Sequence, residues 1–289
     1  FAIKGNKYDG NKFINIALKK GAKIIVSEKK KKIKKEGIIF VKTSKIRKLL
    51  AETCYSFFKK KPKNLVAVTG TNGKSSIADF YYQILNLNSK KVASIGTLGV
   101  RYKNKKKKLN NTTLDPINLC KTLVKLRHEK INHIIMEASS HGLQQNRLDG
   151  LMFDTTIFSN LSHDHLDYHK NMRNYLKTKL YLFEKLTKKE GHIITDASIP
   201  QSKEIKKISN KKKINLNLIF DNKKGIELIS HKFKDEKQIL KIRFKKISYN
   251  FEFNLLGKIQ IKNLLMAVLA AHKSGIKFEK IINVIKKIK

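Results

Sequence analysis

From about residue 61 onward, short continuous apolar runs alternate with segments whose apolar residues recur at helical spacing. The runs are LVAVT, KVASIG, HIIME, TTIFSN and GHIITD. Because they are apolar throughout, they are typical of parallel strands that are covered on both faces. Strands that alternate with helices in this way predict an α/β fold built on a doubly wound, mostly parallel sheet.

The pattern changes between residues 214 and 256. Four runs, LNLIF, IELIS, QILKIRF and YNFEFNL, are separated by polar turns. We expect these runs to form an antiparallel extension of the sheet. Two segments of helical periodicity follow, over residues 259–273 and 277–286.

The first 60 residues indicate a smaller α/β unit. NKFINIALKKG has helical spacing, whereas KIIVS and GIIFV are strand-like. A second helical pattern covers residues 46–58 and is followed by the helix-stopping Pro62. We therefore expect a boundary near residue 60, with an N-terminal domain and linker in residues 1–60 and a central domain in residues 61–289.

Charge is the most unusual feature of the composition. The chain has 289 residues, 40% of them apolar, and a formal net charge of +42. Such a charge favours a nucleic-acid or anionic-membrane partner. However, the excess is nearly all lysine and is spread from end to end. The runs KKKKIKK (29–35) and KNKKKK (103–108) lack interleaved aromatic residues, so we interpret them as solvated loops and expect no specific nucleic-acid partner. A basic nucleic-acid-binding protein remains the alternative.

Cysteine use and hydropathy indicate a cytoplasmic setting. Cys54 and Cys120 are the only cysteines and form no CxxC pair, and nothing resembles a signal peptide at the first residue, Phe1. The longest apolar stretch, LLMAVLAA, is far shorter than the roughly 20 residues that a membrane-spanning helix needs. We therefore expect a cytoplasmic protein without membrane insertion, and the first residue suggests a fragment.

The stretch VAVTGTNGKSS places a strand, a loop of small residues and a helical segment in succession. Glycines allow backbone N–H groups to turn towards phosphate oxygens, and the helix N-terminus adds partial positive charge. In such a loop Lys74 would neutralise the terminal phosphates, and the Ser75 hydroxyl would bind Mg²⁺. A purely structural glycine turn with an exposed lysine is the alternative interpretation.

Acidic residues and histidines follow two later strands. HIIME ends at Glu137, and TTIFSN leads into LSHDHLDYH, which is dense in histidine and aspartate. Open α/β sheets place their ligands at the carboxyl ends of strands, and Mg²⁺ prefers oxygen ligands. These segments are therefore candidates for metal or phosphate binding, although Glu137 alone could be an ordinary carboxylate at the end of a strand.

Five segments together resemble the Mur ligases, in the branch that adds the third residue of the peptidoglycan stem peptide. They are VAVTGTNGKSS, NNTTLDP, IIMEASSHGLQQNRLDG, TTIFSNLSHDHLDYHKNMRNYLKTKLYLF and LLGKIQIKNLLMAVLAA, in the family's order and over nearly the whole chain. The opening FAIKGNKYDGNKFINIALKKGAKIIVSE is similar to the family's N-terminal domain, joined after its beginning.

The resemblance implies ATP-dependent amide formation. The terminal carboxylate of UDP-N-acetylmuramoyl-L-Ala-D-Glu would attack the γ-phosphate, and the amine of an amino acid would displace phosphate from the acyl phosphate. That amino acid is meso-diaminopimelate or L-lysine, and the sequence does not decide between them. Such chemistry calls for cations and positioning donors. The implied cofactors are ATP and Mg²⁺.

The resemblance also implies residue roles. Lys74, Glu137, His165 and Lys179 would be catalytic, and Ser75, Glu137, His165 and Lys179 would lie at the metal. Lys179 falls where the family carries a carbamylated lysine. The nucleotide would contact Gly70, Thr71, Asn72, Gly73, Lys74, Ser75, Ser76 and Asn263. The UDP-muramoyl-dipeptide would contact Asn111, Thr112, Thr113, Ser139, Gln145 and Arg147.

Several positions depart from the family pattern. Ser75 and Ser76 replace the usual pair of threonines and keep the hydroxyl groups, and Gln260 stands where Asn is usual. The chain ends where the central domain would end, so the amino-acid-binding third domain and the N-terminal uridine-binding region are expected to be absent. We expect a monomer that binds ATP but does not complete ligation alone. A nucleotide-binding remnant without turnover is the alternative.

Overall fold

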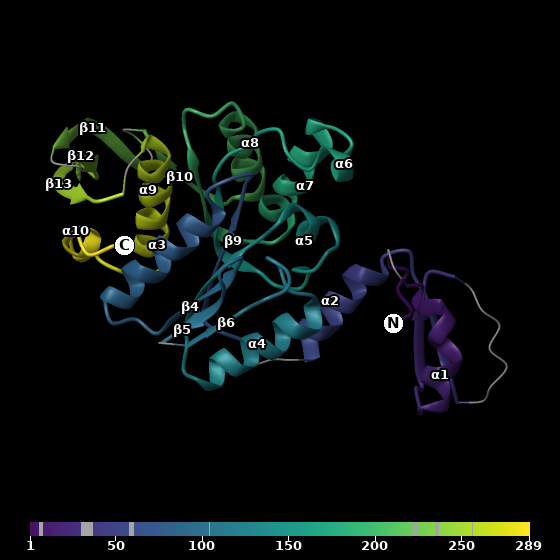
Figure 1. Ribbon diagram of the computed structural model, residues 1–289. Coiled ribbons are helices and arrows are strands. Elements are labelled where there is room, and N and C mark those ends of the chain that lie inside the picture. Colours follow the sequence, from purple (N-terminus) through teal and green to yellow (C-terminus); the bar gives the residue numbers. More distant parts are fainter. Residues whose placement is uncertain are drawn as a thin grey trace.

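The computed structural model describes residues 1–5, 8–29, 37–57, 61–103, 105–221, 223, 225–234, 237–255 and 257–289. A small α/β unit lies beside a large one, and helix α2 (Ile46–Phe57) runs between them (Figure 1). In the small unit, the parallel strands β1 (Ile24–Ser27) and β2 (Ile39–Lys42) pack with η1 (Gly10–Phe13) and α1 (Ile14–Lys19). The lysine run at 29–35, predicted to be a loop, lies outside the described residues after Lys29.

The large unit is built on a sheet of eleven strands among the described residues, in the order β13-β12-β11-β10-β9-β8-β3-β7-β4-β5-β6. The first six strands of this sheet in chain order are β3 (Asn64–Thr69), β4 (Val92–Gly96), β5 (Gly99–Tyr102), β6 (Lys105–Lys107), β7 (His133–Glu137) and β8 (Phe153–Phe158). The later strands are β9 (Thr187–Asp196), β10 (Asn215–Ile219), β11 (Gly225–Lys234), β12 (Lys237–Phe244) and β13 (Ile247–Phe253).

The strands from β4 to β11 are parallel to one another, so the predicted doubly wound, mostly parallel sheet is confirmed. Antiparallel strands extend both ends. One part of the predicted antiparallel extension is wrong: β10 pairs in parallel with β9 and β11. Between β9 and β10, helix α8 (Ser202–Lys212) provides the crossover that a parallel pair requires.

Helices cover both faces of the sheet (Figure 1). One core lies under α3 (Lys74–Leu87), α9 (Lys258–Lys273) and α10 (Phe278–Ile285). The other lies under α2, α4 (Pro116–His128), α7 (Met172–Lys185) and α8. Within β3, Val66 and Val68 join the first core, whereas Leu65 and Ala67 join the second. The continuous apolar run in β3 is thus explained by burial on both faces.

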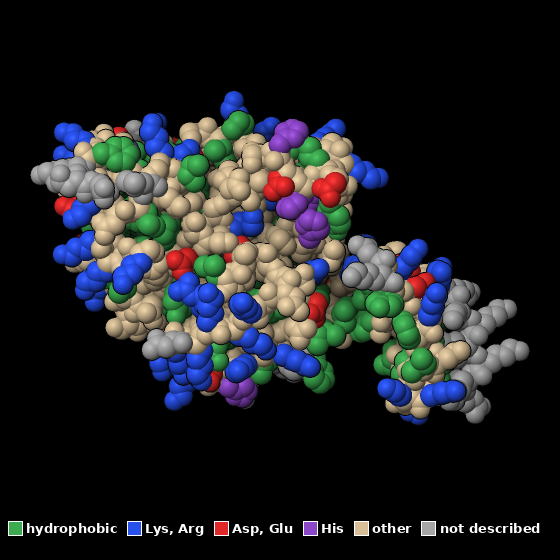
Figure 2. All heavy atoms as spheres, in the orientation of Figure 1, with side chains coloured by type: hydrophobic (Ala, Val, Ile, Leu, Met, Phe, Trp, Pro, Cys, Tyr) green, Lys and Arg blue, Asp and Glu red, His purple; other side chains and the backbone are tan. Residues whose placement is uncertain are grey.

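The edge hairpin β5–β6 is not anticipated by the sequence. Lys105–Lys107 forms an exposed strand, so the expectation of a loop at 103–108 is wrong for these residues. Lysines suit this position because charged side chains protect an unpaired sheet edge. Lys and Arg side chains are also spread over the rest of the visible face (Figure 2). Among the described helices, none has the length and apolar character needed to span a membrane.

Candidate functional site

The loop of residues 70–76, the candidate phosphate loop, lies where β3 ends and α3 begins. Its first residue, Gly70, has φ +151°, and Gly73 has φ +84°. A Cβ atom on Gly70 would lie 1.9 Å from the Ser159 Oγ atom, and one on Gly73 would lie 2.5 Å from the Asn263 Oδ1 atom. Both the backbone conformation and the close packing therefore require glycine.

The carboxyl end of β8 holds this loop in place. The backbone N–H of Thr71 donates to the Asn160 carbonyl at 3.0 Å, and that of Asn72 donates to Asn160 Oδ1 at 3.0 Å. Ser159 Oγ donates to the Asn72 carbonyl at 2.6 Å. Because β3 and β8 are adjacent in the sheet, the loop is fixed before any ligand binds.

Two lysines converge on the carbonyl groups of the loop. Lys74 Nζ donates to Thr71 O at 2.7 Å and to Gly70 O at 3.0 Å. Lys179 Nζ reaches the same Gly70 O at 2.8 Å from α7 and lies 4.2 Å from the ring centroid of Tyr175. Burial, reinforced by the charge of Lys74, lowers the pKa of Lys179 to about 6. Its amine is therefore largely neutral above that pH.

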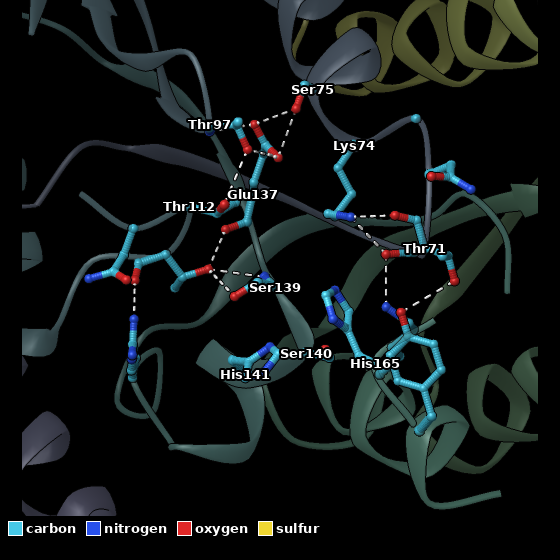
Figure 3. A pocket seen from close by; sticks show the side chains of 18 of the residues that line it. Thr71, Lys74, Ser75, Thr97, Thr112, Glu137, Ser139, Ser140, His141 and His165 are labelled. Carbon is cyan, nitrogen blue, oxygen red and sulfur yellow. Dashed lines mark hydrogen bonds between the residues drawn. The ribbon is translucent and has the colours of Figure 1, made fainter. Parts of the chain in front are cut away.

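Glu137 lies at the end of β7 and is only 2% exposed. Its carboxylate accepts hydrogen bonds from Ser75 Oγ at 3.0 and 3.1 Å, from the Thr97 N–H at 2.8 Å and from Thr97 Oγ1 at 3.1 Å (Figure 3). A Cβ atom on Gly96 would lie 2.2 Å from Glu137 Oε1, so glycine is required there as well.

Whether Mg²⁺ fits this site depends on the oxygen atoms at and around the Glu137 carboxylate. A buried carboxylate and two hydroxyl groups, from Ser75 and Thr97, form a set of hard oxygen ligands, which suits Mg²⁺. Among the residues that the structure describes, no group of three His, Cys, Asp or Glu side chains is placed to hold a metal. The residues fit a Mg²⁺ ion that takes its remaining ligands from nucleotide phosphates and water.

The predicted substrate residues form a connected network. Thr113 Oγ1 donates to the Glu137 carbonyl at 2.9 Å and lies 3.0 Å from Ser139 Oγ. The Arg147 guanidinium donates to the Thr113 carbonyl and to Gln145 Oε1, the latter at 2.8 and 3.1 Å. These contacts join the segment after β6 to the segment after β7 and fix the direction of each polar group.

His165 starts the short helix α6 (Leu166–His169) with a left-handed backbone, φ +51°. Its ring lies 5.1 Å from that of His141, which follows β7 in α5 (Ser140–Gln144). Burial, with smaller contributions from neighbouring His165 and Arg147, lowers the pKa of His141. In Figure 3, both imidazoles lie across the cavity from Glu137.

One cavity of about 460 Å³ unites these groups. Every residue assigned to the site by sequence lines it, with one exception. Asn263 is buried, contacts the loop at Gly73 and donates to Gln260 Oε1 at 3.4 Å. The structure adds lining residues that the sequence analysis did not select: Thr97, Ser140, His141 and Tyr175. His141 lies in the segment IIMEASSHGLQQNRLDG, two residues after Ser139, and this closeness in sequence could have identified it as a lining residue.

The chain is similar to known proteins in both sequence and structure. The chain is 38% identical over 294 residues to a UDP-N-acetylmuramoyl-L-alanyl-D-glutamate--2,6-diaminopimelate ligase of Rickettsia montanensis, covering all of this chain and 60% of that protein. The chain thus spans about 60% of the length of the curated relatives that it matches.

Two solved structures share the fold. A UDP-N-acetylmuramoyl-L-alanyl-D-glutamate--2,6-diaminopimelate ligase superposes with a TM-score of 0.86 at 24% identity, covering 97% of this chain and 57% of the other. The MurF ligase from Thermotoga maritima, in complex with ADP, gives a TM-score of 0.65 at 17% identity, with coverage of 97% and 61%.

Family models match most of the sequence. The Mur ligase middle domain matches residues 68–271, and the catalytic domain of the Mur ligase family matches residues 1–57. The first match covers the phosphate loop, Glu137, His165 and Lys179. The chain therefore belongs to the Mur ligase family.

Proposed function

We propose that this chain is the ATP-binding part of a ligase that joins 2,6-diaminopimelate to UDP-N-acetylmuramoyl-L-alanyl-D-glutamate in peptidoglycan precursor synthesis. The names of its relatives support diaminopimelate over lysine. The observation that carries the proposal is the single cavity in which a phosphate-loop lysine, Lys74, faces a buried carboxylate, Glu137, beside the network around Arg147. Residues 1–60 and 61–289 would be separate domains of a cytoplasmic monomer.

The phosphate loop would bind the triphosphate of ATP. Lys74 now donates to two loop carbonyls, and it would exchange these for the terminal phosphates. The N-terminus of α3 adds partial positive charge at the same place. Asn263, which contacts the loop at Gly73, would lie on the adenine side.

Ser75 and Glu137 would hold Mg²⁺, with Thr97 orienting the carboxylate and His165 nearby on the cavity wall. When bound, the ion supplies positive charge that neutralises phosphate oxygens. The burial of Glu137 supports this assignment, since a buried carboxylate is stabilised when it is paired with a cation.

Lys179 would act as a carbamate. Its largely neutral amine can attack CO₂: a bond forms between Nζ and carbon, and one N–H proton leaves to solvent. The product is an anion, which would be attracted to the Lys74 ammonium at the same loop. In that form the side chain would orient the reacting groups instead of donating to Gly70.

The network around Arg147 would hold the muramoyl-dipeptide. Thr112, Thr113, Ser139 and Gln145 offer hydroxyl and amide donors on the same wall of the cavity, together with Asn111. Held there, the terminal carboxylate of the dipeptide attacks the γ-phosphorus of ATP, ADP leaves, and the amine of diaminopimelate then displaces phosphate from the acyl phosphate. Positioning and charge neutralisation, not a nucleophilic side chain, would lower the barrier.

Calorimetric titration with Mg-ATP tests the proposal on this chain. Lys74→Ala should abolish measurable binding, because it removes the main cation on the phosphates, while the far-UV circular dichroism remains unchanged. Lys185→Ala, at an exposed lysine of α7, is the charge-matched control and should bind as the wild type does. Equal affinity in the wild type and Lys74→Ala would refute the assignment of the loop.

A further inference from the structure

A second cavity, of about 300 Å³, lies between helix α4 and the edge hairpin formed by β5 and β6. These three elements are neighbours in Figure 1. None of the residues that line this cavity also lines the larger one, and the proposed ligase reaction makes no use of it. It is therefore a separate compartment with its own chemistry.

The floor of this cavity is apolar. Val100, Tyr102 and Leu126 are more than nine-tenths buried and belong to the core under α4. Leu109 and Leu114 are half-buried, pack against the same core and also line the cavity. A ligand that covers apolar surface in a concave site gains free energy, because that surface is removed from water. The floor therefore favours a ligand with an apolar body.

Two lysines of β6 stand on the strand side of this floor. In the antiparallel pair, Lys105 lies opposite Tyr102 and Lys107 lies opposite Val100. Residues that are directly opposite in a sheet point to the same face, so both lysines share the face of the apolar floor. Both side chains are exposed, and neither has an ion pair among the described residues. They place two ammonium groups at the rim of the cavity.

Helix α4 forms the other side of the cavity. Asn118, Thr122 and Lys125 recur at helical spacing, so they form the stripe of the helix that borders it. Lys125 is exposed and has no ion pair in the part of the chain that the structure describes. Long lysine side chains lay their methylene groups along apolar surface and keep the ammonium group in water. The rim is thus positive on both sides.

Two carboxylates lie near the cavity, but neither lines it. Asp115 is occupied as the N-cap of α4. Glu129 pairs with Lys103, and this contact is the largest cause of the lowered pKa of Glu129. Lys105 and Lys125 act on the same carboxylate to a smaller extent. Because one carboxylate is shared among three lysines, the rim keeps a net positive charge.

The Tyr102 hydroxyl is an available hydrogen-bond donor in the cavity. The residue is 6% exposed, and its hydroxyl has no hydrogen-bond partner among the described residues. The oxygen is not sealed in the core, in contrast to the buried unpartnered hydroxyls of Thr69 and Thr155. A phenol donates well to a carboxylate, since hydrogen bonds to ionised acceptors are the stronger kind. Lys105, directly opposite Tyr102, would add its charge to the same acceptor.

We propose that this cavity binds a small anionic amphiphile, such as a medium-chain carboxylate, whose apolar body lies on the floor and whose carboxylate meets the Tyr102 hydroxyl and Lys105. The rim lysines alone would not define such a site in so basic a chain, whereas the apolar floor with an available phenol does. A second copy of the chain is a poor occupant, because its net charge of +42 would be repelled by the positive rim.

The position of the cavity relates it to the larger one. Leu109 and Leu114 are the two ends of the segment 109–114, and the residues between them, Asn111, Thr112 and Thr113, line the larger cavity. A ligand on the floor would therefore pack against both ends of this segment. The proposal does not depend on ATP binding or on ligase activity.

Nuclear magnetic resonance of the chain with ¹³C-labelled leucine and valine methyl groups tests the site directly. Octanoate, butanoate and 1-octanol are titrated separately at constant pH and ionic strength, and Val100→Ile and Leu114→Met assign the signals. We expect octanoate to shift the methyl signals of Val100 and Leu114 saturably. Butanoate, with the same charge and a shorter chain, should bind at least about tenfold more weakly, because fewer methylene groups are buried. 1-Octanol, with the same chain length and no charge, should bind at least about threefold more weakly.

Polar variants separate this site from general attraction to a basic protein. Lys125→Gln should weaken octanoate about threefold, the effect of one partly screened charge. Lys121→Gln removes an equal charge from α4 outside the cavity and should have no effect. Tyr102→Phe keeps the ring and should weaken octanoate about fivefold, since the hydrogen bond to a charged acceptor is lost. Equal weakening by the two lysine variants, or equal affinity for octanoate and 1-octanol, would overturn the anionic ligand.

Filling the cavity should remove the site. Thr122→Trp places an indole over the floor from a half-buried position of α4 and keeps every rim lysine. It should abolish the octanoate response of Val100 and Leu114, while the far-UV circular dichroism remains unchanged. An undiminished response in this variant, or no saturable shift in the wild type, would contradict the proposal. So would signals of the floor methyl groups that move on dilution of the free protein, because they would assign this surface to a second copy.

Discussion

The side-chain nitrogens of Lys74 and Lys179 donate to one acceptor, the carbonyl oxygen of Gly70, at 3.0 and 2.8 Å. Two amines at one buried oxygen cannot both carry a proton without repulsion. Lys179 is 1% exposed, and burial followed by the charge of Lys74 lowers its pKa to about 6. The arrangement keeps a neutral, nucleophilic amine beside the candidate phosphate loop.

Replacing this amine with an apolar side chain should stabilise the fold. We expect Lys179→Met to raise the free energy of unfolding near pH 7 by about 1–3 kcal/mol, since the buried polar group is lost and the volume is nearly kept. Urea unfolding in CO₂-free buffer measures this. Lys185→Met, at an exposed position on the same helix, should change stability by no more than about 0.5 kcal/mol.

The same variant should also alter the pH dependence of stability. Between about pH 6 and 10.5 the unfolded chain holds a proton on Lys179 that the folded chain lacks, so the wild type gains stability from this group as pH rises. The gain from Lys179→Met should therefore shrink from about pH 6.5 to about pH 9.5. A gain that is constant over this range would mean that Lys179 is charged in the folded protein.

A neutral Lys179 amine should form a carbamate. With ¹³C-bicarbonate near pH 8, Mg²⁺ and nucleotide, we expect one carbamate carbon signal in the nuclear magnetic resonance spectrum of the wild-type chain. The signal should be absent from Lys179→Met and present in Lys185→Met. If the wild-type signal persists in Lys179→Met, another amine carries the group.

The sequence predicts the candidate phosphate loop because its evidence is local: a strand, a glycine loop and a helix follow one another directly. The sequence also points to Glu137, since that residue ends a strand. It does not point to Lys179, because nothing in the neighbourhood of this residue separates it from the many other lysines, and only the family resemblance selects it. Its burial depends on α7 packing against the loop.

Thr97 shows why some of the residues that line the cavity cannot be predicted from the sequence. Its hydrogen bonds to Glu137 exist because β4 lies beside β7 with Ile95 opposite Met136. That register joins residues 40 positions apart and cannot be read from either strand alone. Tyr175 was missed for a related reason, since its hydroxyl meets Thr71 Oγ1, 104 positions away in the chain, only in the folded protein.

Gly96 should be essential to the position of the Glu137 carboxylate. In Gly96→Ala, the new Cβ atom would overlap Oε1, Cγ and Cδ of Glu137 at 2.2 to 2.6 Å, so the carboxylate must move away from Ser75. We expect Mg²⁺-dependent nucleotide binding to weaken at least about tenfold, with a loss of about 1–3 kcal/mol of stability from overpacking. Calorimetry with and without Mg²⁺ measures the first effect, and urea unfolding the second.

Gly275→Ala controls for stability loss in that experiment. Gly275 has φ +92° and open space around the added Cβ atom, so the variant is strained by about 1–2 kcal/mol but lies away from Glu137. Its nucleotide affinity should match that of the wild type. If both alanine variants bind Mg-nucleotide equally well, the packing of Glu137 against Gly96 has no part in the site.

Arg147 should contribute to the binding of the muramoyl-dipeptide at the cavity wall formed by Thr113 and Gln145. Its guanidinium joins Thr113 to Gln145, so Arg147→Ala removes a cation and also frees the two segments that it connects. UDP-N-acetylmuramoyl-L-Ala-D-Glu should raise the melting temperature of the wild type more than UDP does, because the dipeptide adds contacts to this wall. In Arg147→Ala the excess over UDP should disappear, whereas Arg173→Ala, at an exposed arginine of α7, should retain it. Equal shifts from both ligands in the wild type would place the muramoyl-dipeptide elsewhere.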